Sequence, residues 1–372
     1  MRRRTWAGRI ARLVGAGALV AMFLASPAHA LDDSPRDPLD RAAFSALPSV
    51  YRMTVTIRVD QFADDRRVVR IGRAVTIEGT AFGVGPGIVV TARPLVRPST
   101  AVLAAAVDEL DIPGVAVFDA NDVRITSSVT SIVLRRASPE PTSTTTTVKA
   151  TVLQTTKATA PSKLALLRIP LRDAPALALD DSTTLGTPVV LVAFGGQRDT
   201  EPALQRGALG PAGKVEGSDD ANLVTVSGIG DNVGDMGGPV LDASGHVRGV
   251  VIQRAVAPGE SSVMTRSSGI RQLASNANVA VGTTPAQTTF ADGMRSYWER
   301  DYTAASESLT FAADRLPKDE WVAGLATRAE ELASADYEVV QSAPWRLPLI
   351  LGGVVALAIA LMLALRFWSM EE

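Results

Sequence analysis

Short runs of β-branched and aliphatic residues, separated by turn-forming clusters, dominate the chain from about residue 50 to about residue 272. Runs such as Leu164–Ile169, Val189–Phe194 and Val247–Ile252 are bounded by Gly, Pro, Asp and Ser. Regular short strands with turn chemistry between them are typical of an antiparallel barrel or sandwich. The pattern predicts a mainly β domain over residues 45–275 and leaves the choice between barrel and sandwich open.

The first thirty residues have the features of a secretory signal peptide. An arginine-rich start precedes the apolar run Leu13–Leu24, and the small-residue exit Ala28-His29-Ala30 follows. This order of basic, apolar and A-x-A segments predicts a signal peptide over residues 1–30, cleaved after Ala30. The alternative is an uncleaved membrane anchor.

A second apolar run lies at the other end of the chain. Leu347–Leu365 comprises 19 uncharged residues, with Trp345 and Trp368 at its two ends. At about 1.5 Å per residue such a helix reaches roughly the 30 Å of a bilayer core, and tryptophan favours the membrane interface. We expect a transmembrane helix over residues 346–368 and a cytoplasmic tail over residues 369–372. The alternative is a buried globular helix.

Composition limits the chemistry that is available. The chain has no cysteine, so disulfides and thiolate–metal sites are excluded. Its formal net charge is −2, without a basic cluster in the exported part, which argues against nucleic acid as a partner. We expect no metal and no cofactor. The two terminal segments together predict a single-pass protein of the plasma membrane, with its main domain outside the cytoplasm and its C-terminus inside.

Four motifs resemble the trypsin-like (chymotrypsin/HtrA-type) serine peptidases. The most specific is GDMGGP at Gly234–Pro239, which is similar to the G-[DN]-S-G-G-P nucleophile motif. Gly79–Val96, Lys163–Ile169 and Ala176–Gly196 resemble the segments that carry the general base, the orienting aspartate and the run before the nucleophile. The resemblance implies two packed six-stranded antiparallel barrels with a cleft between them.

None of the three catalytic positions that the resemblance implies keeps its chemistry. The base position is Pro94, the acid position is Lys163 and the nucleophile position is Met236. A serine hydroxyl needs a neighbouring imidazole to take its proton, and proline and methionine supply neither group. The resemblance also implies a residual oxyanion-hole turn, formed by Gly234, Asp235, Met236, Gly237 and Gly238. The same glycines can instead simply allow a turn of the barrel.

A substitute catalytic pair is the alternative. Three serines, Ser227, Ser261 and Ser262, lie in segments expected near the cleft. Lys163 is the candidate lysine for a Ser–Lys pair, because it occupies the expected acid position. His246 is the one histidine of the mature chain, and it lies in a turn after the nucleophile motif. We expect it to face solvent without a catalytic role.

Helical periodicity replaces the β pattern after a Gly/Thr/Pro linker at residues 276–288. Phe290–Pro317 resembles one tetratricopeptide repeat, with Gly293 at the helix contact and Asp301-Tyr302 at the turn. One repeat leaves apolar surface uncovered, so we expect the helix Asp319–Ala335 to cap it and the helical region to span residues 289–338. It serves either as a docking hook for a partner or as a spacer above the membrane.

These features together predict a membrane-anchored trypsin-like pseudopeptidase that binds a peptide or an envelope partner outside the cytoplasm. Peptidase clefts bind peptides by strand addition, which does not require the triad. The expected binding edge consists of Ser262, Val263, Met264, Thr265 and Arg266. The alternatives are a serine endopeptidase with a non-standard catalytic arrangement and a purely structural envelope component.

Overall fold

The structure is a computed structural model, and it describes residues 37–63, 67–69, 74–99, 123–139, 147–182, 184–194, 201–212, 220–229, 232–253, 261–316 and 319–342. Residues Pro38 onward belong to one compact unit. The expected signal peptide and the Leu347–Leu365 run lie outside the described residues. Among the helices that are described, none is long and apolar enough to cross a membrane.

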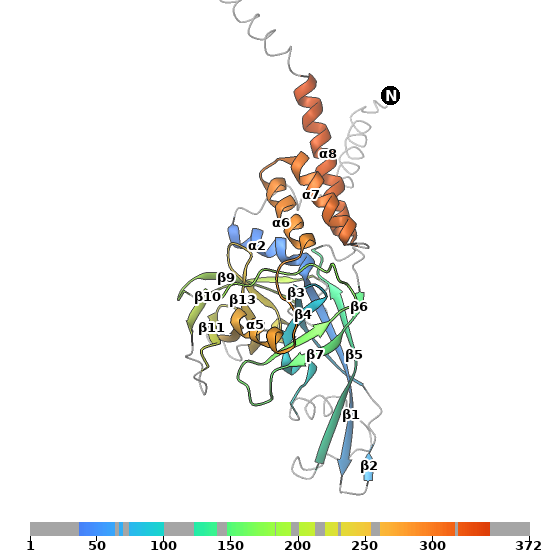
Figure 1. The fold of residues 1–372 in the computed structure, drawn as a ribbon, viewed down its shortest axis with the longest axis vertical. Helices are drawn as coiled ribbons and strands as arrows, with labels where there is room; N and C mark the ends of the chain where they lie inside the picture. Colours follow the sequence, from blue (N-terminus) through green and yellow to red (C-terminus); the bar gives the residue numbers. More distant parts are fainter. Residues whose placement is uncertain are drawn as a thin grey trace, which may run out of the picture. The chain divides into compact units, whose positions relative to one another are not determined.

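The first sheet has eight strands in the order β6-β5-β1-β3-β4-β8-β7, with β2 paired to β1 (Figure 1). The strands are β1 (Val50–Ala63), β2 (Arg67–Val69), β3 (Ala74–Gly85), β4 (Ile88–Ala92), β5 (Val123–Arg136), β6 (Thr147–Lys149), β7 (Thr151–Thr155) and β8 (Leu164–Arg168). Every pairing between them is antiparallel.

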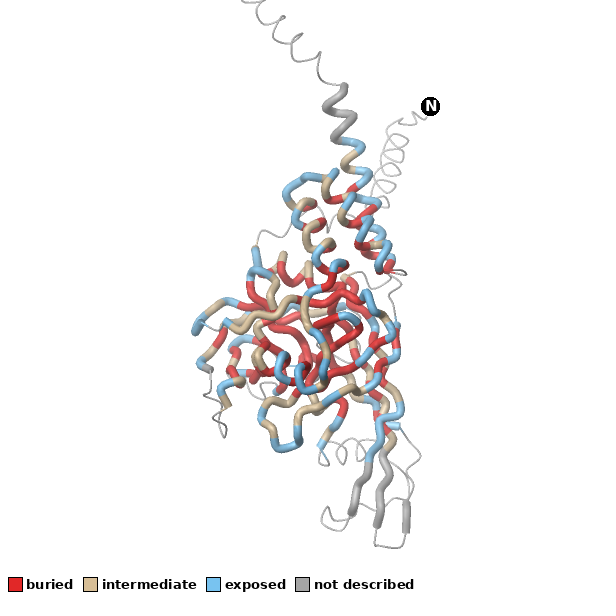
Figure 2. Tube along the Cα trace, viewed as in Figure 1, coloured by how far each residue is buried: buried red, intermediate tan, exposed pale blue. Residues whose placement is uncertain are grey.

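The second sheet closes into a six-stranded barrel in the order β10-β11-β14-β13-β12-β9. Its strands are β9 (Pro188–Ala193), β10 (Ala203–Ala212), β11 (Leu223–Ser227), β12 (Pro239–Leu241), β13 (Val247–Gln253) and β14 (Ser262–Arg266). A core of aliphatic side chains, among them Leu191, Leu209 and Val251, fills its interior. Buried residues gather inside both sheets in Figure 2.

The prediction of two closed barrels is correct for the second sheet only. In the first sheet, one short segment supplies both edges, because β6 pairs with β5 and β7 pairs with β8. The two strands are separated by Ala150, whose N–H donates to Ile132 O at 2.9 Å. The ladder therefore changes partner at Ala150, and the first half of the domain is a half-barrel.

Helices cover one end of the β domain. They are α2 (Pro38–Ala46), α6 (Pro285–Trp298), α7 (Tyr302–Arg315) and α8 (Glu320–Ser342), while α5 (Ser267–Asn276) follows the barrel directly. The α6–α7 hairpin turns at Glu299–Asp301, close to the expected position. A Cβ on Gly293 would lie 2.9 Å from Leu309 Cγ, so glycine is what allows these two helices to approach.

The segment predicted as a linker, 276–288, is partly helical and attached to the sheets. Helix α6 already begins at Pro285, and the Thr284 hydroxyl donates to Ala174 O at 3.2 Å. The Gly282 N–H donates to Val84 O at 2.7 Å. These bonds satisfy backbone groups that a free linker would leave to water, so the segment packs as part of the domain.

Helix α2, which the sequence pattern did not reveal, joins the barrel to the helical region. The Phe44 ring packs edge-on against Trp321 of α8, with ring centroids 5.3 Å apart. Asp40 of α2 pairs with Arg206 of β10 at 2.6 Å. Helix α2 thus covers apolar surface that an isolated helical hairpin would expose. This contact helps to explain how so short a helical region stays folded.

A buried ion pair ties α8 to the first sheet. Arg136 at the end of β5 donates from Nη1 to Asp319 Oδ2 at 3.0 Å, and the two side chains are 2% and 0% exposed. Tyr51 lies beside them, and burial raises the pKa of its phenol while the charge of Arg136 lowers it. The Arg136–Asp319 pair therefore fixes the start of α8 to the β domain.

Candidate functional site: the vacated catalytic positions

The nucleophile position lies just after a short 3-10 helix, η4 (Val233–Asp235). A capping box between Asn232 and Asp235 holds this turn, because each side chain accepts from the other residue's backbone N–H. Gln205 of β10 also donates to Asp235 Oδ2 at 2.9 Å. Asp235 is fully buried, so its carboxylate stabilises the turn and does not reach the surface.

Gly237 is required where the chain leaves this turn. Its φ is +85°, and a Cβ there would lie 2.0 Å from Thr80 O and 2.4 Å from Thr91 Oγ1. Its N–H donates to Val251 O at 2.8 Å. A left-handed conformation combined with so close an approach is available only to glycine. Gly237 thus allows the turn after η4 to pack directly against β3.

Thr80 connects the turn to the first sheet. Its N–H donates to Met236 O at 2.9 Å, and its hydroxyl donates to Gly234 O at 2.8 Å. The Met236 side chain is half-buried. Strand β3 therefore holds the turn that the resemblance predicts as a residual oxyanion hole, and the same bonds fix a turn of the barrel.

The expected base and acid positions lie in two neighbouring segments, α3 (Arg93–Val96) and the start of β8, which are called here one wall of the site. Pro94 is in α3, which follows β4 directly, and Lys163 immediately precedes β8. The Arg93 N–H donates to Lys163 O at 2.8 Å, which joins the two segments. Pro94 and Lys163 are both half-buried.

Gly79 links this wall to the nucleophile turn. A Cβ on Gly79 would lie 2.5 Å from Leu95 Cδ1 of α3 and 3.2 Å from Met236 O. The structure therefore brings together the three positions that the sequence motifs predicted. A pyrrolidine ring, an ammonium group and a thioether offer neither an activated hydroxyl nor a neutral base for it.

The serines considered for a substitute pair have other surroundings. The Ser262 hydroxyl is buried and donates to Ile229 O at 2.7 Å. Ser227 is exposed, and its hydroxyl points to Ala208 O at 3.4 Å. Ser261 is exposed as well. The hydroxyls of Ser262 and Ser227 thus each bond to a backbone carbonyl, and neither of them bonds to Lys163.

The predicted peptide-binding edge requires a correction. Ser262–Arg266 is strand β14, which pairs with β11 on one side and with β13 on the other. Four of its five residues are buried. A strand inside a closed barrel has no unpaired edge, so β14 cannot accept an added strand. The sequence pattern identified the strand correctly and could not show its pairing.

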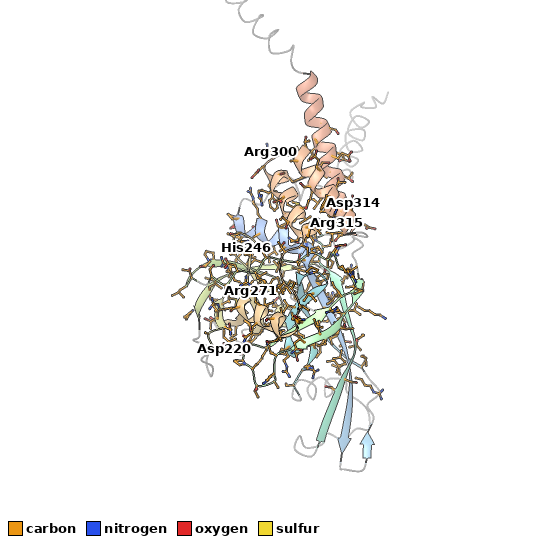
Figure 3. All side chains as sticks on the ribbon, viewed as in Figure 1. Asp220, His246, Arg271, Arg300, Asp314 and Arg315 are labelled. Atoms are coloured by element: carbon orange, nitrogen blue, oxygen red, sulfur yellow. The ribbon has the colours of Figure 1, made fainter. Side chains whose placement is uncertain are left out.

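Sequence reasoning also missed a polar cluster on the second barrel. Arg248 of β13 pairs with Asp180 at 2.7 Å and with Asp242. His246, labelled in Figure 3, is half-buried next to them, and carboxylate oxygens of both aspartates and a His246 nitrogen lie within 4.8 Å of one another. Because Arg248 pairs with both carboxylates, the cluster ties the segment around Asp180 to the barrel.

Asp180 belongs to a segment that is held by several arginines. The backbone N–H of Ser182, at 2.9 Å from Asp180 Oδ1, is the main reason that the pKa of Asp180 lies below its usual value. Partial burial opposes this shift, while the Ser182 hydroxyl and the charge of Arg248 support it. Arg271 of α5 pairs with Asp181 in the same segment. Asp180, Asp181 and Ser182 thus have a structural role here.

Comparison with known proteins agrees with this architecture. Residues 79–250 match the family model described as the trypsin-like peptidase domain. Residues 79–250 therefore form a trypsin-like peptidase domain. No curated protein sequence matches it significantly.

Among solved structures, the chain is similar to HtrA-type and related serine proteases. The Rv3671c protease of M. tuberculosis in its active form is 18% identical with a TM-score of 0.41, and the match covers 65% of this chain and 86% of that one. The serine endoprotease of Yersinia pestis is 12% identical with a TM-score of 0.42, over 66% and 68% of the two chains. The HtrA-type protease AlgW, solved with a tripeptide, is 12% identical with a TM-score of 0.43, over 64% and 62%.

Proposed function

We propose that the chain is a trypsin-like pseudopeptidase, which binds an extended peptide or an envelope partner and does not cut it. The observation that carries this proposal is the convergence of Pro94, Lys163 and Met236 at one place, on a fold that otherwise keeps the peptidase turn. Removing a triad member leaves a peptidase with only the small rate enhancement of its binding groups. Here every member is replaced.

Binding survives such replacements because it uses other groups. Peptides add to the edge of a sheet through main-chain hydrogen bonds, and these need no nucleophile. Val251 of β13 bonds to Gly237 and Gly238 beside Met236, and β13 ends two residues later at the exposed Gln253. Among the described residues, β12 pairs with β13 only as far as Val250, so beyond Val251 the strand pairs with β14 alone. The other side of this short end is the backbone that a peptide passing Met236 would meet.

The experiment for this proposal measures binding and cleavage together. We expect the detergent-extracted full-length protein to bind an unfolded polypeptide saturably and to return it at its original length. A serine endopeptidase with a non-standard catalytic arrangement would shorten the polypeptide. A purely structural component would show no saturable binding.

We also propose that Leu347–Leu365 anchors the protein in the plasma membrane, with the β domain outside the cytoplasm and Glu372 inside. This proposal is supported by the length and apolar character of that run, together with the predicted signal peptide at residues 1–30. Protease added to intact cells should then digest the β domain, while an epitope placed after Glu372 stays protected. An epitope that is cleaved from outside contradicts this topology.

A further inference from the structure

We infer that the vacated catalytic site binds a carboxylate of its peptide partner, through Arg93 and Lys163. The inference rests on the proposed function and names the chemistry of the partner. It starts from a reversal of charge: the family resemblance implies an aspartate where this chain has Lys163, and an imidazole next to the residue that is Arg93 here.

The two basic residues start from adjacent backbone. Arg93 opens α3, and its N–H donates to Lys163 O at 2.8 Å. The pairing of Ala92 with Leu164 continues this contact into β4 and β8. Both residues are half-buried. Two cationic residues therefore start from backbone segments that a hydrogen bond joins, next to Pro94.

Neither cation has an anionic partner among the residues that the structure describes. The Arg93 Nε atom is buried and has no hydrogen-bond partner there. Arg136 and Arg248 also have a buried Nε without a partner, but these two arginines and Arg271 each pair with an aspartate through a terminal nitrogen. Arg93 and Lys163 differ from these three arginines because no acidic residue among the described ones pairs with them.

This arrangement is costly without a ligand. A buried donor that lacks a partner is unfavourable, and two like charges on neighbouring backbone repel each other. Asp235, the acidic residue of the nearby turn, cannot compensate because its carboxylate is buried and bonded to Gln205 and Asn232. A ligand anion would balance the two positive charges and reduce their repulsion.

A carboxylate is the anion that fits a peptide-binding site. The guanidinium group presents its donors in a planar fork that matches the two carboxylate oxygens, and Lys163 adds a point charge beside it. Thr91, two residues before Arg93, lies against Gly237 and so places this wall next to Met236. A peptide passing Met236 would bring to Arg93 either an Asp or Glu side chain or its own C-terminal carboxylate.

Fluorescence anisotropy with defined peptides tests the inference on the detergent-extracted full-length protein. The probes are extended peptides of about ten Val, Ser and Gly residues. One carries a central Glu and an amidated C-terminus, one carries Gln instead, and one is the Gln peptide with a free C-terminal carboxylate. We expect an acidic probe to bind at least about tenfold more tightly than the neutral one, because charge-assisted hydrogen bonds are the strong ones. The Glu probe and the free-acid probe distinguish the two sources of the carboxylate.

Variants assign this preference to the two residues. Arg93→Gln and Lys163→Gln should each reduce it by about tenfold or more, and the double variant should abolish it. Arg168→Gln is the matched control, since Arg168 is an exposed cation at the far end of β8 and its loss should leave the preference intact. Arg93→Lys, which keeps the charge and loses the fork, should retain part of it. Melting temperatures confirm that each variant is folded.

Three outcomes overturn the inference, and they are distinguishable. If all three probes bind equally well and Met236→Asp abolishes binding, the site binds peptides without a carboxylate and the proposed function stands. If none of the probes binds and unfolded casein does not bind either, the proposed function fails and this inference fails with it. If Arg168→Gln reduces the preference for the acidic probes as much as the other variants do, the preference reflects the overall charge of the protein and not this site.

Discussion

Replacing Asp319 with alanine should lower the free energy of unfolding by about 3–5 kcal/mol, because the change leaves the Arg136 charge buried and unpaired. The pair is almost completely shielded from water, with side chains 2% and 0% exposed. Asp319 also accepts from the Val322 N–H at the start of α8, at 3.3 Å. Its loss therefore removes a helix cap together with a counter-ion.

Chemical denaturation monitored by tryptophan fluorescence measures this change, and Trp321 reports locally because it lies two residues from Asp319. Glu331→Ala is the matched control: it breaks the Arg328–Glu331 pair, whose side chains are 43% and 61% exposed. An exposed pair contributes about 0–1 kcal/mol, so the control should lose little.

The double variant Arg136→Met with Asp319→Leu should recover most of the stability, since apolar residues of similar volume often replace buried ion pairs well. Similar small losses for Asp319→Ala and Glu331→Ala would mean that the helical region is not fixed to the β domain through this contact.

Gly237→Ala should be the most damaging small substitution in the site. A left-handed conformation costs a non-glycine residue about 1–2 kcal/mol, and the new Cβ would lie 2.0 Å from the Thr80 carbonyl oxygen. Because that neighbour is backbone, relief requires a shift of β3 against the Met236 turn. We expect a total loss of at least about 3 kcal/mol, in the range of overpacked core substitutions.

Gly245→Ala separates the two contributions. Gly245 has a similar φ of +78°, but a Cβ there would meet nothing within 4 Å. The control should thus lose only the conformational cost, about 1–2 kcal/mol. Thermal unfolding of the two variants side by side gives the difference. Equal losses at both positions would show that β3 and the turn are not in the tight contact that the structure describes.

The sequence was sufficient to predict strands and a candidate site, because both depend on local patterns. Strand character follows from β-branched runs, and the order of the four motifs predicted that Pro94, Lys163 and Met236 lie close together. The match of residues 79–250 to the trypsin-like peptidase domain confirms the resemblance. Helix α7 begins at Tyr302, within a residue of the turn that was expected from the repeat pattern.

Pairing and long-range contacts could not be predicted from local patterns. Strand β14 reads as a strand in the sequence, but only the ladder with β11 and β13 shows that it has no free edge. Arg136 and Asp319 are 183 residues apart, so nothing local connects them. Helix α2 had one signal, Pro38 at its first position followed by apolar residues at helical spacing, and its short length concealed it.

The central claim, that this peptidase site lacks catalytic chemistry, is tested most directly by an active-site probe. The detergent-extracted full-length protein is incubated with a fluorescent fluorophosphonate beside active trypsin, and labelled residues are identified by mass spectrometry. With Pro94, Lys163 and Met236 in the three catalytic positions, we predict that no serine is labelled while trypsin is labelled fully. A labelled serine whose signal disappears when it is changed to alanine would contradict the account and establish an active serine peptidase.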